Sequence, residues 1–329
     1  MVLTVNNQSL YNDLTSVTYN HILPTIQDVY FKVSTIFPFL FRPGNYETFS
    51  GTTIQVPLQY APLKGGPTVD CGTFDISYAE TDTAMVFIPK EYYTSVTLSR
   101  QRIALNQGDA AAMSYVQIKM QNLYQSMMQY LAQDTFKDGQ GVQSGVNALD
   151  GLLAANDDGT TYTSYGGLAR AGIGTGPNAG INGYKQAVNA PISVAILQAA
   201  IGNGSFGNVQ PNLIFTTQNI WDTLWLRLFP SQRIMDDDPT VNSFGPASLK
   251  FYGNKRVMVD QYISSGYVFG VRDEFLKAYV VEDPLFQFGF TGFKELPDSF
   301  DGAGQTAFLG DIVNSQPRVS FILTNVNNT

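Results

Sequence analysis

Apolar and polar residues alternate over 54–60, with Ile54, Val56 and Leu58 on one face. This period-two pattern predicts a strand with one buried face. The run 61–72, rich in glycine and proline, predicts a wide turn. The alternation resumes at 74–78 and continues to Leu98, so the region predicts a long hairpin whose return strand begins near Phe74.

Two prolines limit where this hairpin can pair. Pro57 and Pro89 lack the N–H group that a central strand donates, so they belong at edges. A two-stranded ribbon is marginally stable alone. The hairpin therefore needs support from elsewhere, and a neighbouring subunit is the simplest source.

A long amphipathic helix is predicted over 109–136. Asp109 is a suitable N-cap, and the helix would be about 42 Å long. Glycine at 139 and 141 ends it. Its apolar residues form a stripe at steps of three and four: Met113, Val116, Met120, Leu123, Met127 and Leu131, widened by Tyr124 and Met128. Such a methionine-rich stripe can form a binding groove, but core packing is the commoner use, and we expect core.

The second half of the chain predicts a mixed α/β unit. After an irregular stretch, 156–184, Pro191 introduces a short helix that Gly202 ends. A buried strand at 211–215 precedes a helix capped by Thr217 and ended by Pro230. Further strands are predicted at 249–252, 257–259, 267–271, 275–281, 308–313 and 319–323. The last two are expected to form a ribbon beside the long helix.

Residues 1–45 resemble an arm, which is polar to about Asn20 and aromatic over 29–41. That aromatic run needs a surface to cover, in this chain or in a neighbour. The N-terminus lacks a basic start and an apolar core, so no signal peptide is predicted. No apolar stretch approaches the roughly 20 residues of a membrane span.

Composition excludes several classes of protein. Only 14% of the residues are charged, so disordered and coiled-coil chains fit poorly. Uncharged polar surface suits contacts with other protein. The net charge of −8 and the lack of Lys/Arg clusters argue against tight binding of nucleic acid. The one cysteine, Cys71, cannot form an intrachain disulfide, which fits a reducing compartment.

The sequence offers little for catalysis. His21 is the one histidine, so nucleophile–histidine and zinc sites are hard to build. Asp236–Asp238 and Asp157–Gly159 lack metal-loop spacing, and the glycines of 172–176 are not placed as in a phosphate loop. We expect no catalytic, cofactor or metal site, although a pair of carboxylates distant in sequence stays open.

The order of arm, hairpin, long helix and α/β unit resembles the major capsid proteins of tailed bacteriophages, which have the HK97-type fold. The stretches that carry the resemblance are PFLFRPGNYETFSGTTIQVPLQY (38–60), TSVTLSRQRIALNQGD (94–109), VNALDGLLAANDDGTTYTSYGGLAR (146–170) and PNLIFTTQNIWDTL (211–224). The resemblance implies an α+β chain with an arm at 1–49 and an extended loop at 50–98. It places a peripheral domain with a spine helix at 99–150 and 300–329, and an axial domain at 151–299.

The resemblance also implies a function. The chain would be a structural subunit, not an enzyme, that forms hexamers and pentamers of itself in an icosahedral shell around phage DNA. It would need no cofactor and no membrane, would grip the DNA only weakly, and would reside in the virion after assembly in the host cytoplasm. Scaffold, portal and decoration proteins are further expected partners.

Contacts between subunits are expected at six residues of the hairpin and arm: Tyr60, Leu63, Lys64, Val69, Phe37 and Phe41. Some relatives crosslink through a lysine on this loop, and Lys64 lies at the predicted tip. The partner asparagine and the assisting glutamate cannot be matched in this sequence.

Three alternatives remain open. An encapsulin-like compartment uses the same fold to enclose enzymes instead of DNA. A tail or adhesion protein is a second structural class, although the long helix argues against a β-rich fibre. A carboxylate-based hydrolase is the third, against which the shortage of histidine counts.

Overall fold

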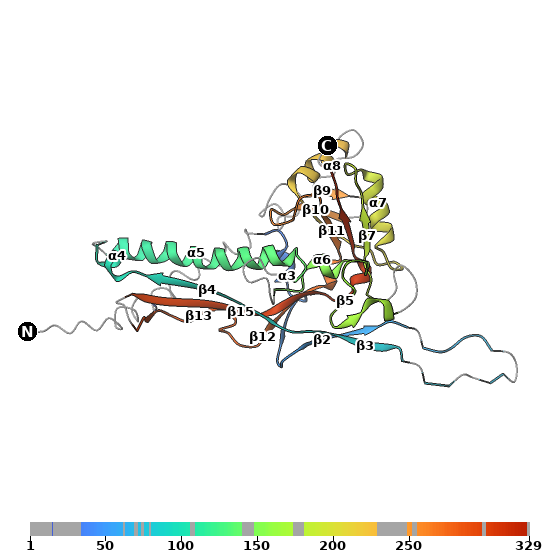
Figure 1. The fold of residues 1–329 in the computed structure, drawn as a ribbon, viewed down its shortest axis with the longest axis horizontal. Coiled ribbons are helices and arrows are strands. Elements are labelled where there is room, and N and C mark those ends of the chain that lie inside the picture. Colours follow the sequence, from blue (N-terminus) through green and yellow to red (C-terminus); the bar gives the residue numbers. More distant parts are fainter. Residues whose placement is uncertain are drawn as a thin grey trace, which may run out of the picture.

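The computed structural model has three parts (Figure 1): a long limb, a lobe that rises above one end of it, and a hairpin that projects past the lobe. The structure describes Thr15 and residues 34–61, 63–68, 72–73, 76–78, 80–105, 109–139, 148–173, 181–228, 249–251, 255–297 and 301–327.

The limb contains a six-stranded sheet built around the strand β15 (Gly302–Asn314). One edge of β15 pairs antiparallel with β4 (Lys90–Leu98), from Gly302 opposite Leu98 to Gly310 opposite Lys90. Its other edge pairs antiparallel with three shorter strands: β14 (Lys294–Glu295), β13 (Gln287–Phe290) and β12 (Leu276–Val281). The sixth strand, β1 (Tyr46–Phe49), pairs parallel with β12.

The predicted long helix is α5 (Asp109–Thr135), which runs along the limb beside β4 and β15 (Figure 1). A short helix, α4 (Arg100–Leu105), precedes it. Phe136 follows it and packs on the rings of Phe215 and Phe269 in the lobe. The methionine stripe is therefore core, as predicted. Seven of its side chains are at most 3% exposed: Val116, Met120, Leu123, Tyr124, Met127, Met128 and Leu131.

The lobe is a second six-stranded sheet with helices α7 (Val194–Asn203) and α8 (Gln218–Leu228) on one face. The helix α7 starts later than predicted, because Ser193 caps it by accepting a hydrogen bond from the Ile196 N–H (3.2 Å). Every residue of the central β8 is buried, in agreement with the buried strand predicted at 211–215. The strand order is β7 (Tyr184–Ala187), β16 (Phe321–Thr324), β11 (Val268–Val271), β8 (Leu213–Thr216), β10 (Lys255–Val259) and β9 (Leu249–Phe251).

The hairpin consists of β2 (Ile54–Gln59) and β3 (Asp82–Phe87), which pair antiparallel in a sheet of their own. The prediction that the return strand begins near Phe74 is wrong, because residues 76–78 are irregular and β3 begins only at Asp82. The strand run also does not continue to Leu98 as one element. It breaks at Ile88–Pro89, and β4 beyond this break belongs to the limb sheet.

Short elements connect the three parts. Helix α6 (Leu152–Ala155), the pair β5 (Ser164–Tyr165) and β6 (Leu168–Ala169) and a 3₁₀ turn at Arg170–Gly172 lie between the lobe and the hairpin. Further 3₁₀ turns occupy Asp273–Phe275 and Pro317–Val319. No helix within the described ranges is both long and apolar enough for a membrane span.

The end of the arm is part of the subunit's own core. Asp260 accepts hydrogen bonds from the hydroxyl of Ser34 and from the backbone N–H (2.9 Å) and hydroxyl (3.1 Å) of Thr35. The helix α3 (Phe37–Leu40) then packs under the lobe and the limb sheet. Its aromatic residues therefore cover this chain's own body.

The predicted ribbon at the C-terminus is wrong. The strands β15 and β16 join different sheets, so β15 lies beside α5 whereas β16 enters the lobe. The strands β12, β13 and β14 in turn belong to the limb sheet, although they precede residue 300. The limb sheet is therefore built from strands on both sides of residue 300.

Replacement of Met127 by alanine tests the role of the stripe. Met127 is fully buried, so Met127→Ala should lower the free energy of unfolding by about 2–5 kcal/mol. Ile118→Ala is the matched control on the same helix, because Ile118 is 54% exposed and should cost less than about 0.5 kcal/mol. Urea unfolding of the unassembled subunit measures both, and equal effects would contradict the assignment of the stripe to the core.

Candidate assembly surfaces

The base of the hairpin rests on this chain. Apolar side chains of β2 and β3 alternate inward and join a buried cluster with residues of α6, the β5–β6 turn and the limb sheet. The rings of Phe87 and Tyr165 meet edge to face, with centroids 5.2 Å apart. The support that the sequence left open is thus intramolecular for this half of the hairpin. The buried side chains of the strands are Ile54, Val56, Leu58, Met85 and Phe87.

Arg170 holds the segment on which the hairpin rests. Its guanidinium is buried and donates hydrogen bonds to four backbone carbonyls, while it stacks over the Tyr165 ring, with its central carbon 5.4 Å from the centroid. The acceptors are the carbonyls of Asp157, Ile181, Ala154 and Ala155. One side chain thereby ties α6, the Asp157 loop and residue 181 together under Tyr165.

Gly166 brings this segment against β3. Its carbonyl accepts a hydrogen bond from the Val86 N–H at 2.8 Å. It has φ +55°, and a Cβ there would lie 2.7 Å from the Cβ of Met85. A glycine is therefore required both by the left-handed backbone and by the close approach.

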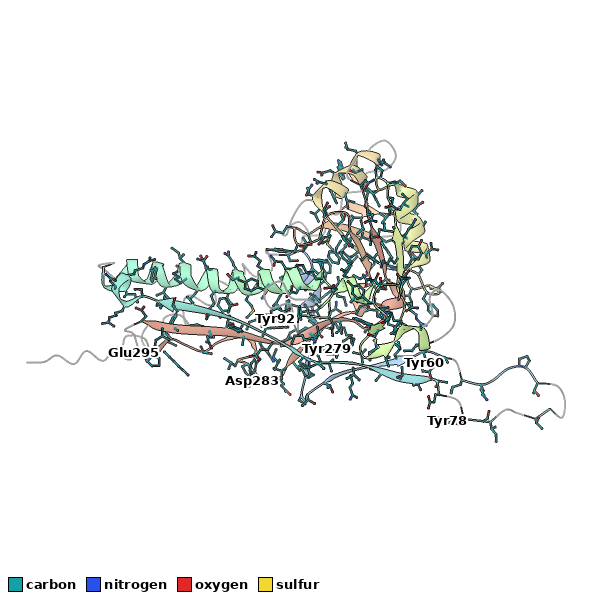
Figure 2. All side chains as sticks on the ribbon, in the orientation of Figure 1. Tyr60, Tyr78, Tyr92, Tyr279, Asp283 and Glu295 are labelled. Carbon is teal, nitrogen blue, oxygen red and sulfur yellow. The ribbon has the colours of Figure 1, made fainter. Side chains whose placement is uncertain are left out.

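The distal half of the hairpin extends beyond this support (Figure 2). Of the residues that the structure describes there, Leu63, Ile76 and Tyr78 are 73%, 93% and 87% exposed. Lys64 donates a hydrogen bond to the Ser77 hydroxyl, which links the two arms of the tip. Exposed apolar side chains gathered on a projecting segment indicate a protein interaction site.

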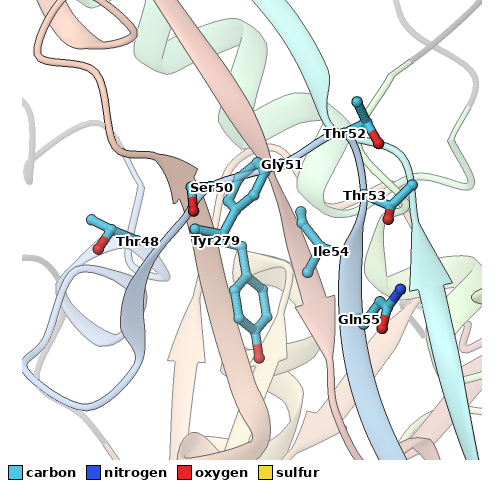
Figure 3. A pocket seen from close by; sticks show the side chains of 9 residues that line it. Thr48, Ser50, Gly51, Thr52, Thr53, Ile54, Gln55 and Tyr279 are labelled. Atoms are coloured by element: carbon cyan, nitrogen blue, oxygen red, sulfur yellow. The ribbon is translucent and has the colours of Figure 1, made fainter.

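An open pocket of about 500 Å³ lies at the root of the hairpin, where β1 leads into β2 (Figure 3). Tyr279 is its one titratable lining residue, and burial and the neighbouring Glu47 raise the pKa of that phenol to about 12. The hydroxyls of the pocket thus have no general base beside them among its lining residues. The lining is Thr48, Phe49, Ser50, Gly51, Thr52, Thr53, Ile54, Gln55 and Tyr279.

Comparison with solved structures identifies the architecture. The capsid asymmetric unit of cyanophage A-1(L) matches with a TM-score of 0.63 and 12% identity, over 89% of this chain and 93% of that one. The capsid of a native GTA particle gives a TM-score of 0.54 and 10% identity, over 89% and 90% of the two chains. The chain has the HK97-type capsid fold. The holo-SrpI encapsulin of Synechococcus elongatus PCC 7942 also matches, with a TM-score of 0.53 and 9% identity over 87% and 86%.

The likeness to solved structures is found by comparing folds and not by comparing sequences. No protein-family model matches the sequence, and no curated protein matches it. The structural likeness, at 12% identity or less, therefore establishes the α+β HK97-type architecture that the sequence predicts, while function needs its own argument.

Within the HK97-type fold, the six predicted contact residues lie in different surroundings. Leu63 and Lys64 lie on the exposed tip, and Tyr60 is half-buried against the cluster at the hairpin base. Phe37 is 1% exposed, and Phe41 packs its ring on Phe37, Tyr46 and Phe288 of the same chain. Val69 lies outside the described residues. Sequence reasoning missed Ile76 and Tyr78 as surface residues, because their alternation resembled that of a strand.

The acidic loop at Asp157 has a structural role. Its carboxylate accepts hydrogen bonds from the backbone N–H groups of Gly159, Thr161 and Tyr162 and from Lys185 at 2.6 Å. Burial by itself would raise the pKa of Asp157, but the bonds from Lys185 and the backbone outweigh it and place the pKa below its usual range. Among the described residues, no group of three or more His, Cys, Asp or Glu side chains could hold a metal ion. His21, Cys71 and Asp236–Asp238 lie outside those residues.

Two glycine-to-alanine variants separate backbone strain from contact at the hairpin. Gly207 has φ +59° and open space around it, so Gly207→Ala should cost only the left-handed strain of about 1–2 kcal/mol. Gly166→Ala adds contact with Met85 and Phe87, and should cost about 1–3 kcal/mol more. Amide exchange in β2 and β3 should accelerate only in Gly166→Ala. Equal stability and equal exchange in the two variants would contradict the docking described for Gly166.

Proposed function

We propose that this chain is the major capsid protein of a tailed bacteriophage, a structural subunit that assembles into the head shell around DNA. The observation that carries the proposal is the hairpin tip. It extends past the subunit's own support and exposes Leu63, Ile76 and Tyr78 to solvent, on a chain whose fold is that of capsid subunits.

The tip and the body of the subunit fit a contact between unlike surfaces. A projecting segment of one copy that rests on a different surface of the next makes a heterologous interface, and such interfaces form rings when the rotation between copies closes. We propose that the rings are the hexamers and pentamers of an icosahedral shell. Many weak contacts of this kind give a stable particle, because each subunit is held by several neighbours at once.

The low charge of the chain supports the same role. With 14% charged residues and a net charge of −8, the subunit has wide uncharged surface for neighbours and little attraction for phosphate. Packaged DNA would therefore be enclosed without a tight grip. We place the protein in the virion after assembly in the host cytoplasm, with scaffold, portal and decoration proteins as further partners.

An encapsulin-like compartment is the second candidate, because the SrpI encapsulin shares the fold at a similar level of likeness. The contents of the particle distinguish the two functions. A capsid isolated from its natural source encloses DNA that nuclease cannot reach until the shell is opened. An encapsulin encloses protein cargo and releases no such DNA.

We therefore expect particles from the natural source to yield nuclease-protected DNA of uniform length. Agarose gels of nuclease-treated particles, before and after denaturation of the shell, make the measurement. Particles that contain other proteins in place of DNA would reject the phage function in favour of the compartment.

The tip itself can be tested by the double variant Ile76→Ser/Tyr78→Ser. Both side chains are almost fully exposed, so the subunit should keep its thermal stability while shell formation falls at least tenfold. The control Thr73→Ser is exposed on the same arm of the hairpin and keeps both apolar groups and the bond between Lys64 and Ser77, so it should assemble like the wild type. Size-exclusion chromatography and negative-stain imaging quantify the shells. Assembly of the double variant at the wild-type level would remove the tip from the proposed interface.

A further inference from the structure

The segment Ala148–Gly151 leads from the limb to the lobe and is held by side chains of two limb strands. The Leu149 N–H donates a hydrogen bond to the hydroxyl oxygen of Tyr92 on β4 at 3.0 Å. The Asp150 N–H donates to Oδ1 of Asp311 on β15 at 3.1 Å. We call this segment the crossover. Its position therefore depends on the state of the Asp311 carboxyl group.

Asp311 is completely buried. Its Oδ1 also accepts a hydrogen bond from the Ile312 N–H at 2.8 Å. Its other oxygen, Oδ2, is buried too and receives no hydrogen bond from the described residues. A buried carboxylate with one oxygen unpaired is costly, because nothing replaces the water lost from that oxygen.

The side chain of Asp150 lies within hydrogen-bonding reach of Asp311. Two carboxylates in contact cannot readily both be ionised. A proton between them would supply a hydrogen-bond donor at a site where the described residues supply none to Oδ2. The other titratable groups facing the pair do not supply a positive charge. Tyr92 donates its hydroxyl to Asp134 at 2.8 Å, which brings a third carboxyl near.

Tyr165 of β5 faces the pair from the side of the lobe, and its hydroxyl accepts a hydrogen bond from the Asn314 N–H at 3.0 Å. Arg170 stacks on the Tyr165 ring and directs its guanidinium to backbone carbonyls. Neither Asp150 nor Asp311 forms an ion pair with a described lysine or arginine. Within the described part of the chain, no basic side chain therefore compensates the charge of this pair.

We propose that Asp311 carries a proton that bonds its carboxyl group to that of Asp150, and that this contact is a pH-dependent latch that fixes the crossover to β15. With the proton present, the carboxyl pair closes and the Asp150 N–H stays on Oδ1. When it is lost, two negative charges face each other in a buried site beside Asp134. The crossover then separates from β15, and the junction of limb and lobe loosens.

The direction of the pH effect follows from the burial of Asp311. Burial first, and then the charge of Asp150, raise the pKa of Asp311 well above its usual range. Because the pKa is raised in the folded state, the latch stabilises the fold fully at pH values below the ordinary pKa of the carboxyl group. This stabilisation is lost as pH rises through the pKa of the folded state. The subunit should thus be less stable on the alkaline side.

Asp311→Asn tests the latch in the unassembled full-length subunit. The asparagine amide imitates the protonated acid, because its N–H can donate to Asp150 and its oxygen can accept from the backbone. Thermal unfolding is measured from about pH 5 to about pH 9, where one pKa unit corresponds to roughly 2 °C in a chain of this length. As pH rises through the range in which Asp311 ionises, the melting temperature of Asp311→Asn should increase relative to that of the wild type by roughly 2 °C per pH unit.

Two further variants complete the test. In Asp150→Asn the amide N–H donor lies on residue 150 instead of residue 311, and the melting temperature should increase relative to the wild type in the same way. This variant keeps the test valid if Asp311→Asn does not fold. Glu91→Gln is the control, because Glu91 is an exposed carboxyl on the same strand as Tyr92 and its difference from wild type should not change with pH.

Infrared spectroscopy of protein labelled with ¹³C-aspartate provides a direct signal. The wild type should show a protonated-carboxyl band at neutral pH that both asparagine variants lose and Glu91→Gln keeps. A wild type without this band would overturn the proposal. So would asparagine variants whose melting temperatures follow the wild type in parallel at every pH.

Discussion

The subunit depends on one strand, β15, because all of its parts meet there. Over thirteen residues it pairs with β4 on one edge and with β14, β13 and β12 on the other. Its buried Phe308 packs in the central core. At its end, the Asn314 N–H donates a hydrogen bond to the Tyr165 hydroxyl below the lobe. The chain then turns directly into β16 of the lobe sheet. Limb, lobe and hairpin are therefore held in one geometry by a single backbone segment.

The hairpin combines a fixed base with an unsupported tip. Its base is buried against α6 and the Arg170 segment, so its direction is set within the subunit. Its tip carries exposed apolar side chains that nothing described in the chain covers. This division suits a shell, since the base fixes where the tip points and the neighbour supplies the burial that the tip lacks.

The sequence predicted the elements whose pattern is local. The stripe of α5 and the alternation of β2 were read correctly, since burial of one face sets a period of its own. The alternation at 74–78 was misleading, because β2 ends at Gln59 and β3 begins only at Asp82, and the described residues 76–78 lie outside any strand. The strand β15 begins with Gly302, Ala303 and Gly304, which form no apolar alternation, and packing requires the small size of Gly304. A Cβ on Gly304 would meet Phe290 at 2.4 Å.

The candidate surfaces followed the same rule. Leu63 and Lys64 were correctly placed on the tip, because a Gly/Pro-rich turn predicts one; their contact with a neighbour stays a prediction. Phe37 and Phe41 contact this chain's own core, since an aromatic run does not reveal which surface it covers. Arg170 has no sequence signal, because its acceptors are backbone carbonyls. Asp311 does have a sequence signal, because it is a lone acid in the apolar run FLGDIV and a charge inside a buried strand requires compensation.

Electron cryomicroscopy of the assembled protein would show whether the hairpin tip joins one subunit to the next. We expect closed icosahedral shells in which Leu63, Ile76 and Tyr78 of each hairpin tip are buried against the next copy, while the hairpin base keeps its contacts with Tyr165. A protein that stays monomeric under all assembly conditions would contradict the role in a shell. Shells in which the tips remain exposed to solvent would contradict the role of the tip.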